Sequence, residues 1–501
     1  MKIFDPAQIR AWDAYTIDNE LVTSVELMNR AAQAFTDWFI QIYPDSQRPV
    51  CVFAGTGNNG GDGLAVARLL YQRFYDVKVF VGDFTGKRSG DFEAQQTAVP
   101  EGVEMTVLKK WEGTVAIDKN DIVVDALFGT GLSRPLADKP WPQIINYLNA
   151  LPNDIVAIDL PSGLFANQHT DSPVVYADRT FAFETPKRAF FFPENAGRVG
   201  EWAYGPIGLH PNFERETATS FHYLTHTDAQ ELVQPRAKFG HKGSFGHALL
   251  LAGSRGKIGA AVLAARACLR SGVGLLTVHT SGCGYSVVQT SVPEAMCSTD
   301  AHLDLISQLP DLQKITTVGI GPGLGNHADT ATAMRQLLEA VQHPMVLDAD
   351  ALNLLAQHPH WWPLVPKNSI LTPHPKEFER LFGPSANEFD RNGLHRRMAQ
   401  EHDVIIVLKG AHTAIVLPDG SCWFNSTGNP GMATGGTGDV LTGILTGLLA
   451  QGYAPEKAAR LGVYLHGLAG DLAATKHSQA ALIAGDLVEA MGEGWRVLGE
   501  H

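Results

Sequence analysis

The sequence predicts an α/β protein with two domains, each built on a sheet of largely parallel strands. Short apolar runs of strand type alternate with longer runs of helix type along most of the 501 residues. This alternation is typical of parallel sheets covered by helices on both faces. The rhythm breaks between residues 206 and 246, where His, Thr, Pro and Gly accumulate. We therefore expect a domain boundary near residue 222, with domains at 1–222 and 223–501.

The first part of the chain opens with two helices. Asp5 and Pro6 suit an N-cap followed by a proline at the first helical position, and Gln8 is placed to complete a capping box. Thr23 and Glu26 repeat that signature before a second helix. The segments expected next are strands at 49–55, 77–83, 121–129 and 154–163, and a helix at 64–74.

The second part resumes the same alternation. HALLLAGS (247–254) reads as a strand, and AAVLAARACLRSG (260–272) reads as a small-residue helix ended by a glycine. Six strand-type segments follow, at 274–280, 316–323, 345–350, 369–374, 404–410 and 412–420.

Composition and charge exclude several classes of protein. The net charge of -13 argues against a nucleic-acid-binding surface, although a local loop could still bind a nucleotide. The five cysteines form no CxxC pair, which indicates a reducing compartment. The first twenty residues carry charges throughout, unlike a signal peptide, and no apolar run is long enough to cross a membrane. We expect a cytoplasmic enzyme with small-molecule partners and no membrane partner.

The stretch GTGNNGGDG (55–63) follows a strand, opens a helix and contains a literal GxGxxG pattern. In that context the pattern indicates a dinucleotide-binding loop, but alone it is a weak signal. Asn58 and Asn59 place two side-chain amides where a simple phosphate-binding turn needs none. Asp62 is expected in the first helical turn, where the helix dipole favours a carboxylate. It serves either as a helix cap or as a functional group, and the sequence leaves both open.

Two further strand ends are expected beside this loop. VVDALFGTGLSRPL (123–136) ends a strand at Asp125, and AIDLPSG (157–163) ends another at Asp159. Ligands bind beyond the carboxyl ends of such strands. Asn59, Asp125 and Ser162 would offer oxygen ligands, which suit an alkali or alkaline-earth cation rather than zinc. Asp159 is a candidate acid/base, since burial can raise the pKa of a carboxyl group toward neutrality.

The second domain carries its own candidate motifs. His374 lies between two prolines at a strand end, Lys409 ends a strand before a glycine turn, and TGGTGD (434–439) precedes an apolar helix. His374 and Lys409 could each be ordinary surface residues. The last motif is harder to dismiss, because a helix cap needs one Asp and not three glycines with two threonines. No P-loop motif or protein-kinase motif set is present.

Two further residues of this domain receive structural interpretations, and a third is a weak functional candidate. His466 reads as a packed helix histidine and Asp350 as a helix N-cap, whereas Asp348 is a weak candidate for a pocket.

These ordered motifs resemble those of the bifunctional NAD(P)H-hydrate repair enzymes. In that family an epimerase of the R and S hydrates of NADH and NADPH (NADHX and NADPHX) is fused to an ADP- or ATP-dependent dehydratase. The resemblance covers nearly the whole chain and includes GIGPGLG (319–325), VLKGAHT (407–413) and NPGMATGGTGDVLTG (429–443). The segment at 164–174 departs from the turn that is usual there.

For the first domain the resemblance implies a Rossmann-like three-layer α/β/α epimerase. Asp159 would be its acid/base, and Asn59, Asp125 and Ser162 would bind potassium. The residues expected to contact the hydrate are Asn58, Asn59, Gly60, Gly61, Asp62, Gly129, Thr130, Gly131, Leu132, Ser133, Arg134, Pro135 and Asp159.

For the second domain the resemblance implies a ribokinase-like dehydratase. Such fused chains of the bacterial type usually use ADP, and their eukaryotic counterparts ATP. The residues expected at the S-hydrate are Ala260, Gly323, His374 and Asp439. Those expected at the adenine nucleotide are Lys409, Gly410, Ala411, His412, Thr413 and Gly438.

The residue types suit phosphorylation of the hydrate hydroxyl followed by elimination of phosphate. The glycine amides before Asp439 can hold the transferring phosphoryl group, and Asp439 can take the hydroxyl proton. Mg²⁺ bridging the nucleotide phosphates is expected, with Asp348 nearby, and so is a homo-oligomer.

Three alternatives remain at this point. They are a small-molecule kinase fused to a dinucleotide-binding domain, a nucleotide-sensing binding module, and a dehydrogenase, although no hydride-transfer constellation supports the last.

Overall fold

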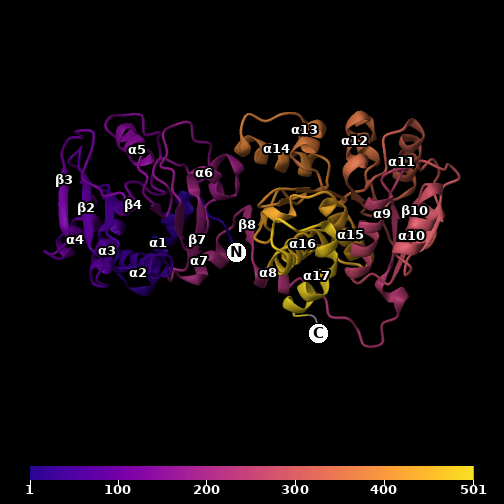
Figure 1. The fold of residues 1–501 in the computed structure, drawn as a ribbon, viewed down its shortest axis with the longest axis horizontal. Coiled ribbons are helices and arrows are strands. Elements are labelled where there is room, and N and C mark those ends of the chain that lie inside the picture. The colour runs from indigo at the N-terminus through magenta and orange to yellow at the C-terminus, as the bar shows by residue number, and fades with distance from the viewer. Residues whose placement is uncertain (500–501) are drawn as a thin grey trace. The chain divides into compact units, whose positions relative to one another are not determined.

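The computed structural model describes residues 1–499, which form two compact units (Figure 1). Residues Lys2–Thr219 make up one unit, and Ser220–Ala386 with residues 390–499 make up most of the other. Strand β8 (Phe221–Leu224), which spans the expected boundary near residue 222, pairs with β17 (Cys422–Asn425) of the second unit. None of the helices in residues 1–499 combines the length and the apolar character that crossing a bilayer requires.

The first unit begins with the two expected helices. Asp5 caps α1 (Pro6–Glu20) in a capping box with Gln8, and Thr23 caps α2 (Ser24–Ile42) in another with Glu26. Both sequence predictions are confirmed, because each cap satisfies backbone amides that have no partner within the helix.

Seven parallel strands form the sheet of the first unit, in the order β3-β2-β1-β4-β5-β6-β7. An order that reverses at β1 is that of a doubly wound sheet, with its ligand site at the reversal. The strands are β1 (Val50–Ala54), β2 (Val77–Gly82), β3 (Glu104–Leu108), β4 (Ile122–Ala126), β5 (Ile155–Ile158), β6 (Arg179–Phe183) and β7 (Glu201–Gly205). The other helices are α3 (Asn58–Tyr71), α4 (Gly90–Ala98), α5 (Trp141–Asn149), α6 (Ala196–Val199) and α7 (Pro211–Glu216), with short 3-10 turns η1 (Arg188–Phe191) and η2 (Pro193–Asn195).

The core of this unit lies on both faces of the sheet. Val52 packs in a cluster with Phe35 of α2 and Leu64 of α3, whereas its neighbour Phe53 packs in a cluster with Ile144 of α5. Successive strand residues point to opposite faces, so both faces need an apolar cover. The unit is therefore the predicted three-layer α/β/α domain.

The second unit contains a mixed sheet of ten strands, in the order β11-β10-β9-β12-β13-β14-β15-β16-β17-β8. Pairing is parallel except where β16 runs antiparallel to β15 and β17. The strands not yet given are β9 (His247–Leu251), β10 (Leu275–Thr280), β11 (Met296–Thr299), β12 (Thr317–Ile320), β13 (Val346–Leu347), β14 (Ile370–Leu371), β15 (Ile405–Leu408) and β16 (Ala414–Val416).

The helices of this unit are α8 (His226–Gln230), α9 (Ile258–Arg270), α10 (Tyr285–Ser291), α11 (Ala328–Ala340), α12 (Ala349–Gln357), α13 (Pro375–Phe382), α14 (Glu388–Glu401), α15 (Thr437–Ala450), α16 (Pro455–His477) and α17 (Ala484–Val497). Its 3-10 turns are η3 (Lys242–Phe245), η4 (Gly282–Gly284), η5 (Pro359–Leu364) and η6 (Pro430–Met432).

Helices α9 and α15 lie side by side and in unusually close contact (Figure 1). A Cβ atom at Gly443 of α15 would lie only 2.1 Å from the carbonyl oxygen of Ala264 in α9. The helix that follows TGGTGD is therefore fixed in position by packing of small residues.

We expect Gly443→Ala to destabilise the second unit by about 1–3 kcal/mol, because the two helices would have to move apart. Denaturant unfolding of the full chain measures the change. Gly492→Ala is the matched control, since nothing lies within 4 Å of a Cβ atom there. It should be neutral or stabilise by about 0.5–1 kcal/mol, and equal effects of the two substitutions would contradict this account of the packing.

Candidate active sites

The first glycine loop connects β1 to α3 at the point where the strand order reverses. A Cβ atom at Gly55 would lie 2.2 Å from the Leu127 carbonyl oxygen, and one at Gly60 would lie 1.9 Å from the Gly55 carbonyl oxygen. Glycine is thus required for the close approach of the loop to its own helix and to the loop after β4. Helix α3 begins at Asn58, so the prediction that Asp62 lies in the first helical turn is wrong; Asp62 lies one turn further in and does not cap the helix.

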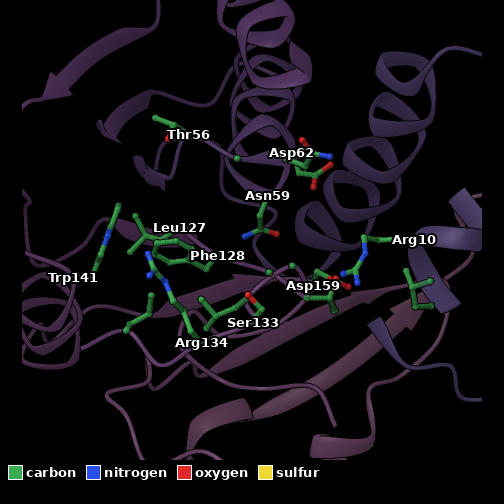
Figure 2. Close-up of a pocket in the computed structure, with 18 of the residues that line it drawn as sticks. Arg10, Thr56, Asn59, Asp62, Leu127, Phe128, Ser133, Arg134, Trp141 and Asp159 are labelled. Atoms are coloured by element: carbon green, nitrogen blue, oxygen red, sulfur yellow. The ribbon is translucent and has the colours of Figure 1, made fainter. Parts of the chain in front are cut away.

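A cavity of about 670 Å³ opens at the carboxyl ends of these strands (Figure 2). It lies between α1, the start of α3, the loop after β4 and the residue that follows β5. The cavity does not include Gly60 or Gly61, which are buried against Gly55 and Met28. The predicted residues that do line it are Asn58, Asn59, Asp62, Gly129, Thr130, Gly131, Leu132, Ser133, Arg134, Pro135 and Asp159.

Asp159 lies in this cavity directly after β5, with φ +64°. A non-glycine residue in the left-handed region is uncommon and is often found at functional sites. Its Oδ1 atom lies 2.9 Å from Nζ of Lys187, and the two side chains are only 10% and 2% exposed. Lys187 also donates to the carbonyl oxygens of Phe183 (2.9 Å) and Thr185 (3.0 Å). A buried ion pair with these extra hydrogen bonds holds the Asp159 carboxylate in one position.

Lys187 is a site residue that the sequence analysis missed. It precedes an apolar run, RAFFF, in a segment with no glycine loop and no strand-end aspartate. The only available signal was a lysine flanked by apolar sequence, which is ambiguous. Arg10, Asp13 and Glu184 line the same cavity and were missed as well.

Three other carboxyl groups of the cavity have raised pKa values. Burial, with the charge of Asp159 adding to it, raises the pKa of Asp13 to about 6. Burial and the charges of Asp159 and Asp13 raise the pKa of Asp62 well above its usual value. Burial also raises the pKa of Glu184. Carboxyl groups with raised pKa values are common at sites of acid/base catalysis.

Of the three residues expected at a cation, Asn59 lines this cavity, whereas Asp125 and Ser162 are buried and do not line it. Ser162 donates from Oγ to Oδ1 of Asp125 (2.6 Å) and from its backbone nitrogen to Oδ2 (2.7 Å). The carbonyl oxygen of Phe128 lies 3.1 Å from the Ser162 hydroxyl. Burial raises the pKa of Asp125 to about 6, against the hydrogen bonds from Ser162 and Leu127.

Asn59 completes this oxygen-rich group from α3. A Cβ atom at Gly129 would lie 2.7 Å from its Oδ1 atom, and its Nδ2 atom is buried without a hydrogen-bond partner. Carboxylate, hydroxyl, amide and carbonyl oxygens are the ligands of alkali cations. In residues 1–499 no group of three or more His, Cys, Asp or Glu side chains is placed to hold a metal ion.

In the second unit, Asp348, Lys409 and α15 form the centre of a second site. Asp348 lies at the N-cap position of α12, and its Oδ1 atom is 2.8 Å from Nζ of Lys409. Thr442 of α15 donates to its Oδ2 atom (2.7 Å). A Cβ atom at Gly438 would lie 3.5 Å from Nζ of Lys409, so the glycine motif, the lysine and Asp348 meet at one point.

Asp350 does not cap α12, and that prediction is wrong. It lies in the first turn, where it accepts a hydrogen bond from the backbone nitrogen of Gly325 (2.8 Å) and pairs with Lys257 (3.3 Å). The carboxylate therefore ties the loop after β12 to the start of α9.

The motif TGGTGD forms the start of α15. Gly436 is the N-cap with φ +96°, a conformation that favours glycine, and Asp439 lies in the first helical turn. Burial and the nearby charge of Asp348 raise the pKa of Asp439 to about 6, and Lys409 opposes this shift. Its carboxyl group is thus poised to take up a proton near neutral pH, next to backbone amides that can bind an anion.

His374 and His466 both stabilise local structure around this site. His374 caps α13, and its Nδ1 atom accepts from the backbone nitrogens of Lys376 (3.1 Å) and Glu377 (3.3 Å). His466 of α16 donates from Nε2 to the Thr437 carbonyl oxygen (2.9 Å), and burial lowers its pKa to about 4. The interpretation of His466 as a packed helix histidine is confirmed.

The other residues expected at this site lie on two neighbouring loops. A Cβ atom at Gly323 would lie 3.2 Å from that of Ala260 at the start of α9. Residues 409–413 form the turn between the antiparallel strands β15 and β16, where Thr413 donates from Oγ1 to the Gly410 carbonyl oxygen (3.1 Å).

Two family models match this chain. The model described as YjeF-related protein N-terminus matches residues 24–189, and the model described as NAD(P)H-hydrate dehydratase matches residues 248–492. The chain is 36% identical to a bifunctional NAD(P)H-hydrate repair enzyme of Moorella thermoacetica, covering 98% of this chain and 96% of the relative. It is 35% identical to the enzyme of that name in Coxiella burnetii, with 97% of each chain covered.

The second unit is also similar to solved structures. An ADP/ATP-dependent NAD(P)H-hydrate dehydratase from Bacillus subtilis, co-crystallised with ATP and Mg²⁺, matches with 35% identity and a TM-score of 0.51, over 56% of this chain and 100% of that one. A ribokinase-like superfamily protein from Enterococcus faecalis matches with 29% identity and a TM-score of 0.50, over 56% of this chain and 98% of that one.

The fold and the two sites thus define a bifunctional enzyme, with a Rossmann-like domain followed by a ribokinase-like domain. The chain belongs to the family of the bifunctional NAD(P)H-hydrate repair enzymes, which join an epimerase domain to a dehydratase domain. The matches to both family models support this function over a small-molecule kinase fused to a sensing domain.

Proposed function

We propose that residues 1–222 interconvert the R and S hydrates of NADH and NADPH, and that residues 223–501 dehydrate the S-hydrate with ADP. The main observation in favour of an epimerase is the Asp159–Lys187 ion pair in the cavity of the first unit. Asp159 acts as an acid/base, because its carboxylate is fixed, nearly buried and open to the substrate cavity. Asn58, Asn59 and Asp62 at the start of α3 and the loop at 129–135 hold the hydrate.

Asn59, Asp125 and Ser162 would hold a potassium ion at the epimerase cavity. The oxygen atoms of these side chains support this assignment: Asn59 Oδ1 faces Gly129, and the Asp125 carboxylate lies 2.6 Å from the Ser162 hydroxyl. When bound, the ion supplies positive charge that fixes the loop after β4, while the residues themselves orient the substrate.

Asn59→Ala is expected to raise the K⁺ concentration needed for half-maximal epimerisation by about tenfold or more, because one ligand is lost. The rate is measured against KCl, with a large organic cation keeping the ionic strength constant. Dehydration of the S-hydrate by the same variant is the control and should not change. An unaltered K⁺ dependence would remove Asn59 from the site.

In the second unit, the main support for a dehydratase comes from Asp439 and the backbone amides that precede it. We assign Ala260, Gly323, His374 and Asp439 to the S-hydrate, and Lys409, Gly410, Ala411, His412, Thr413 and Gly438 to the adenine nucleotide. Asp439 takes the proton of the hydrate hydroxyl as that oxygen attacks the terminal phosphorus of ADP, and AMP leaves with the electron pair of the broken P–O bond. Phosphate then leaves with the C–O electron pair, and loss of the ring proton restores the dihydropyridine.

A magnesium ion is expected with the nucleotide phosphates, where it would supply charge neutralisation for phosphoryl transfer. Lys409 and Thr442 bond the two oxygens of Asp348. Within residues 1–499 the carboxyl group of Asp439 forms no hydrogen bond or ion pair with a side chain. Lys409 contributes a positive charge beside Gly438, where the phosphates would lie.

Dehydration of purified S-NADHX with ADP and with ATP, compared side by side, tests the proposal. Recovery of dihydronicotinamide absorbance is expected with ADP and to a smaller extent with ATP. No recovery with either nucleotide would overturn it. A cytoplasmic location and a homo-oligomeric state complete the proposal.

A further inference from the structure

Helix α1 lines the epimerase cavity although it lies outside residues 24–189, the part that matches the family model of this domain. Ile9, Arg10 and Asp13 reach the cavity from this helix, and Figure 2 shows Arg10 on it, at the edge of the cavity that holds Asp159. A capping box of Asp5 with Gln8 stabilises the start of this helix. Helix α1 is therefore part of the wall of the active site, although the glycine-rich motifs do not indicate it.

Asp13 is the residue of α1 that presents a carboxyl group to the cavity. Within residues 1–499, no side chain or backbone group forms a hydrogen bond or ion pair with its carboxyl oxygens. The charged groups that act on it are Asp159, Lys187 and Glu184, and it acts in turn on Asp62. An unpartnered carboxyl group in a half-buried position is costly unless it serves a ligand.

Asp13 and Asp159 differ in their partners. Lys187 pairs with Asp159 at 2.9 Å and makes no contact with Asp13 within hydrogen-bond distance. Burial and the charge of Asp159 raise the pKa of Asp13 to about 6, so the acid form of Asp13 is available near neutral pH. Two carboxyl groups in one cavity, one paired with a lysine and the other without a partner, can divide the roles of base and acid.

The hydrate carries a hydroxyl group on a carbon that is bonded to a ring nitrogen. Inversion at this carbon needs both an acid and a base. The nitrogen lone pair forms a C=N bond as the C–O bond breaks, and the departing oxygen takes a proton and leaves as water. A second water molecule then adds to the other face of the ring and gives up a proton to a base. No oxidant or reductant is consumed, and the proton balance is restored by exchange with solvent.

We propose that Asp13 is a second catalytic residue of the epimerase, the acid that protonates the departing hydroxyl while the Asp159 carboxylate receives the proton of the incoming water. This inference rests on the proposed epimerase function. For the opposite epimer the same two residues exchange roles, because the reaction is run in reverse.

Asp13→Asn is expected to lower the rate of R-to-S epimerisation by about 100-fold or more, with little change in KM, because general acid catalysis is lost. Asp18→Asn is the matched control: Asp18 lies on the exposed side of the same helix, and its variant should epimerise like the unaltered chain. Dehydration of S-NADHX by each variant reports that the chain is folded.

The pH profile of the unaltered chain provides a second measurement that does not depend on a variant. Epimerisation should decline as the pH rises through the pKa of Asp13, and Asp13→Glu should retain this decline with a displaced midpoint. In water enriched in heavy oxygen, each inversion should place one solvent oxygen in the hydrate.

Three results would overturn the inference: an unchanged rate in Asp13→Asn, a flat profile through the range in which Asp13 titrates, or inversion without uptake of solvent oxygen. Failure of the unaltered chain to epimerise would instead overturn the proposed function, so the two failures are distinguishable.

Discussion

Replacing Asp439 with Asn is expected to abolish dehydration of S-NADHX and to leave nucleotide binding nearly intact. The amide keeps the size of the side chain but cannot accept the hydroxyl proton at the moment of phosphoryl transfer. General base catalysis contributes about 100- to 10,000-fold, so kcat should fall by at least that range. The backbone amides of α15 and the Lys409 ammonium group remain in place to hold the phosphates.

Titration calorimetry with ADP, beside the dehydration rate, measures both effects on one preparation. Epimerisation by the same variant is the internal control for folding and should not change. Loss of ADP binding together with loss of dehydration would show that Asp439 supports the nucleotide rather than acting on the hydroxyl.

The pH dependence of dehydration follows from the same residue. Asp439 must be ionised to act as a base, and its pKa is raised to about 6 by burial and Asp348. The rate should therefore be low below that pH and rise as the pH increases through it. Asp348 is hydrogen-bonded to Lys409 and Thr442, and its charge acts on Asp439. Replacing Thr442 should therefore change the pH at which the dehydration rate is half-maximal.

The second large effect is expected at Asp159. Asp159→Asn should reduce epimerisation by about 100-fold or more, because the amide cannot exchange a proton. Asn is the suitable replacement, since it tolerates the left-handed backbone conformation at φ +64° and retains an oxygen for Lys187. Alanine would instead leave the buried Lys187 ammonium group unpaired, at a cost of about 3–5 kcal/mol.

The rate of R-to-S conversion, followed by chromatography of the two epimers, measures this effect. Dehydration of pure S-NADHX by the variant should remain at the level of the unaltered chain. An epimerisation rate that survives unchanged would exclude Asp159 as the acid/base.

Much of the fold could be predicted because the strands and helices differ in periodicity and length. The capping boxes at Asp5 and Thr23 and the buried strands β1, β4 and β9 are clear in the sequence. Strands β8 and β17 could not be predicted, since their pairing joins residues 221–224 to residues 422–425 and leaves no local pattern.

The residues of the candidate sites also fall into two groups, those that could be predicted from the sequence and those that could not. Residues at the carboxyl ends of strands, such as Asp125 in β4 and Asp159 after β5, could be predicted because parallel strands bring these ends together. Asp13 and Lys187 could not, because α1 and the segment before η1 reach the cavity only through tertiary packing. Asp350 shows the opposite error: a cap signal in the sequence proved to be a contact with another loop.

A mixture of R- and S-NADHX incubated with ADP tests the bifunctional account most directly. The unaltered chain should convert the whole mixture to NADH, Asp159→Asn should convert rapidly only the fraction that was S at the start, and Asp439→Asn should convert none while still equilibrating the epimers. Complete and rapid conversion by Asp159→Asn, or any sustained conversion by Asp439→Asn, would contradict the division of the reaction between the two domains.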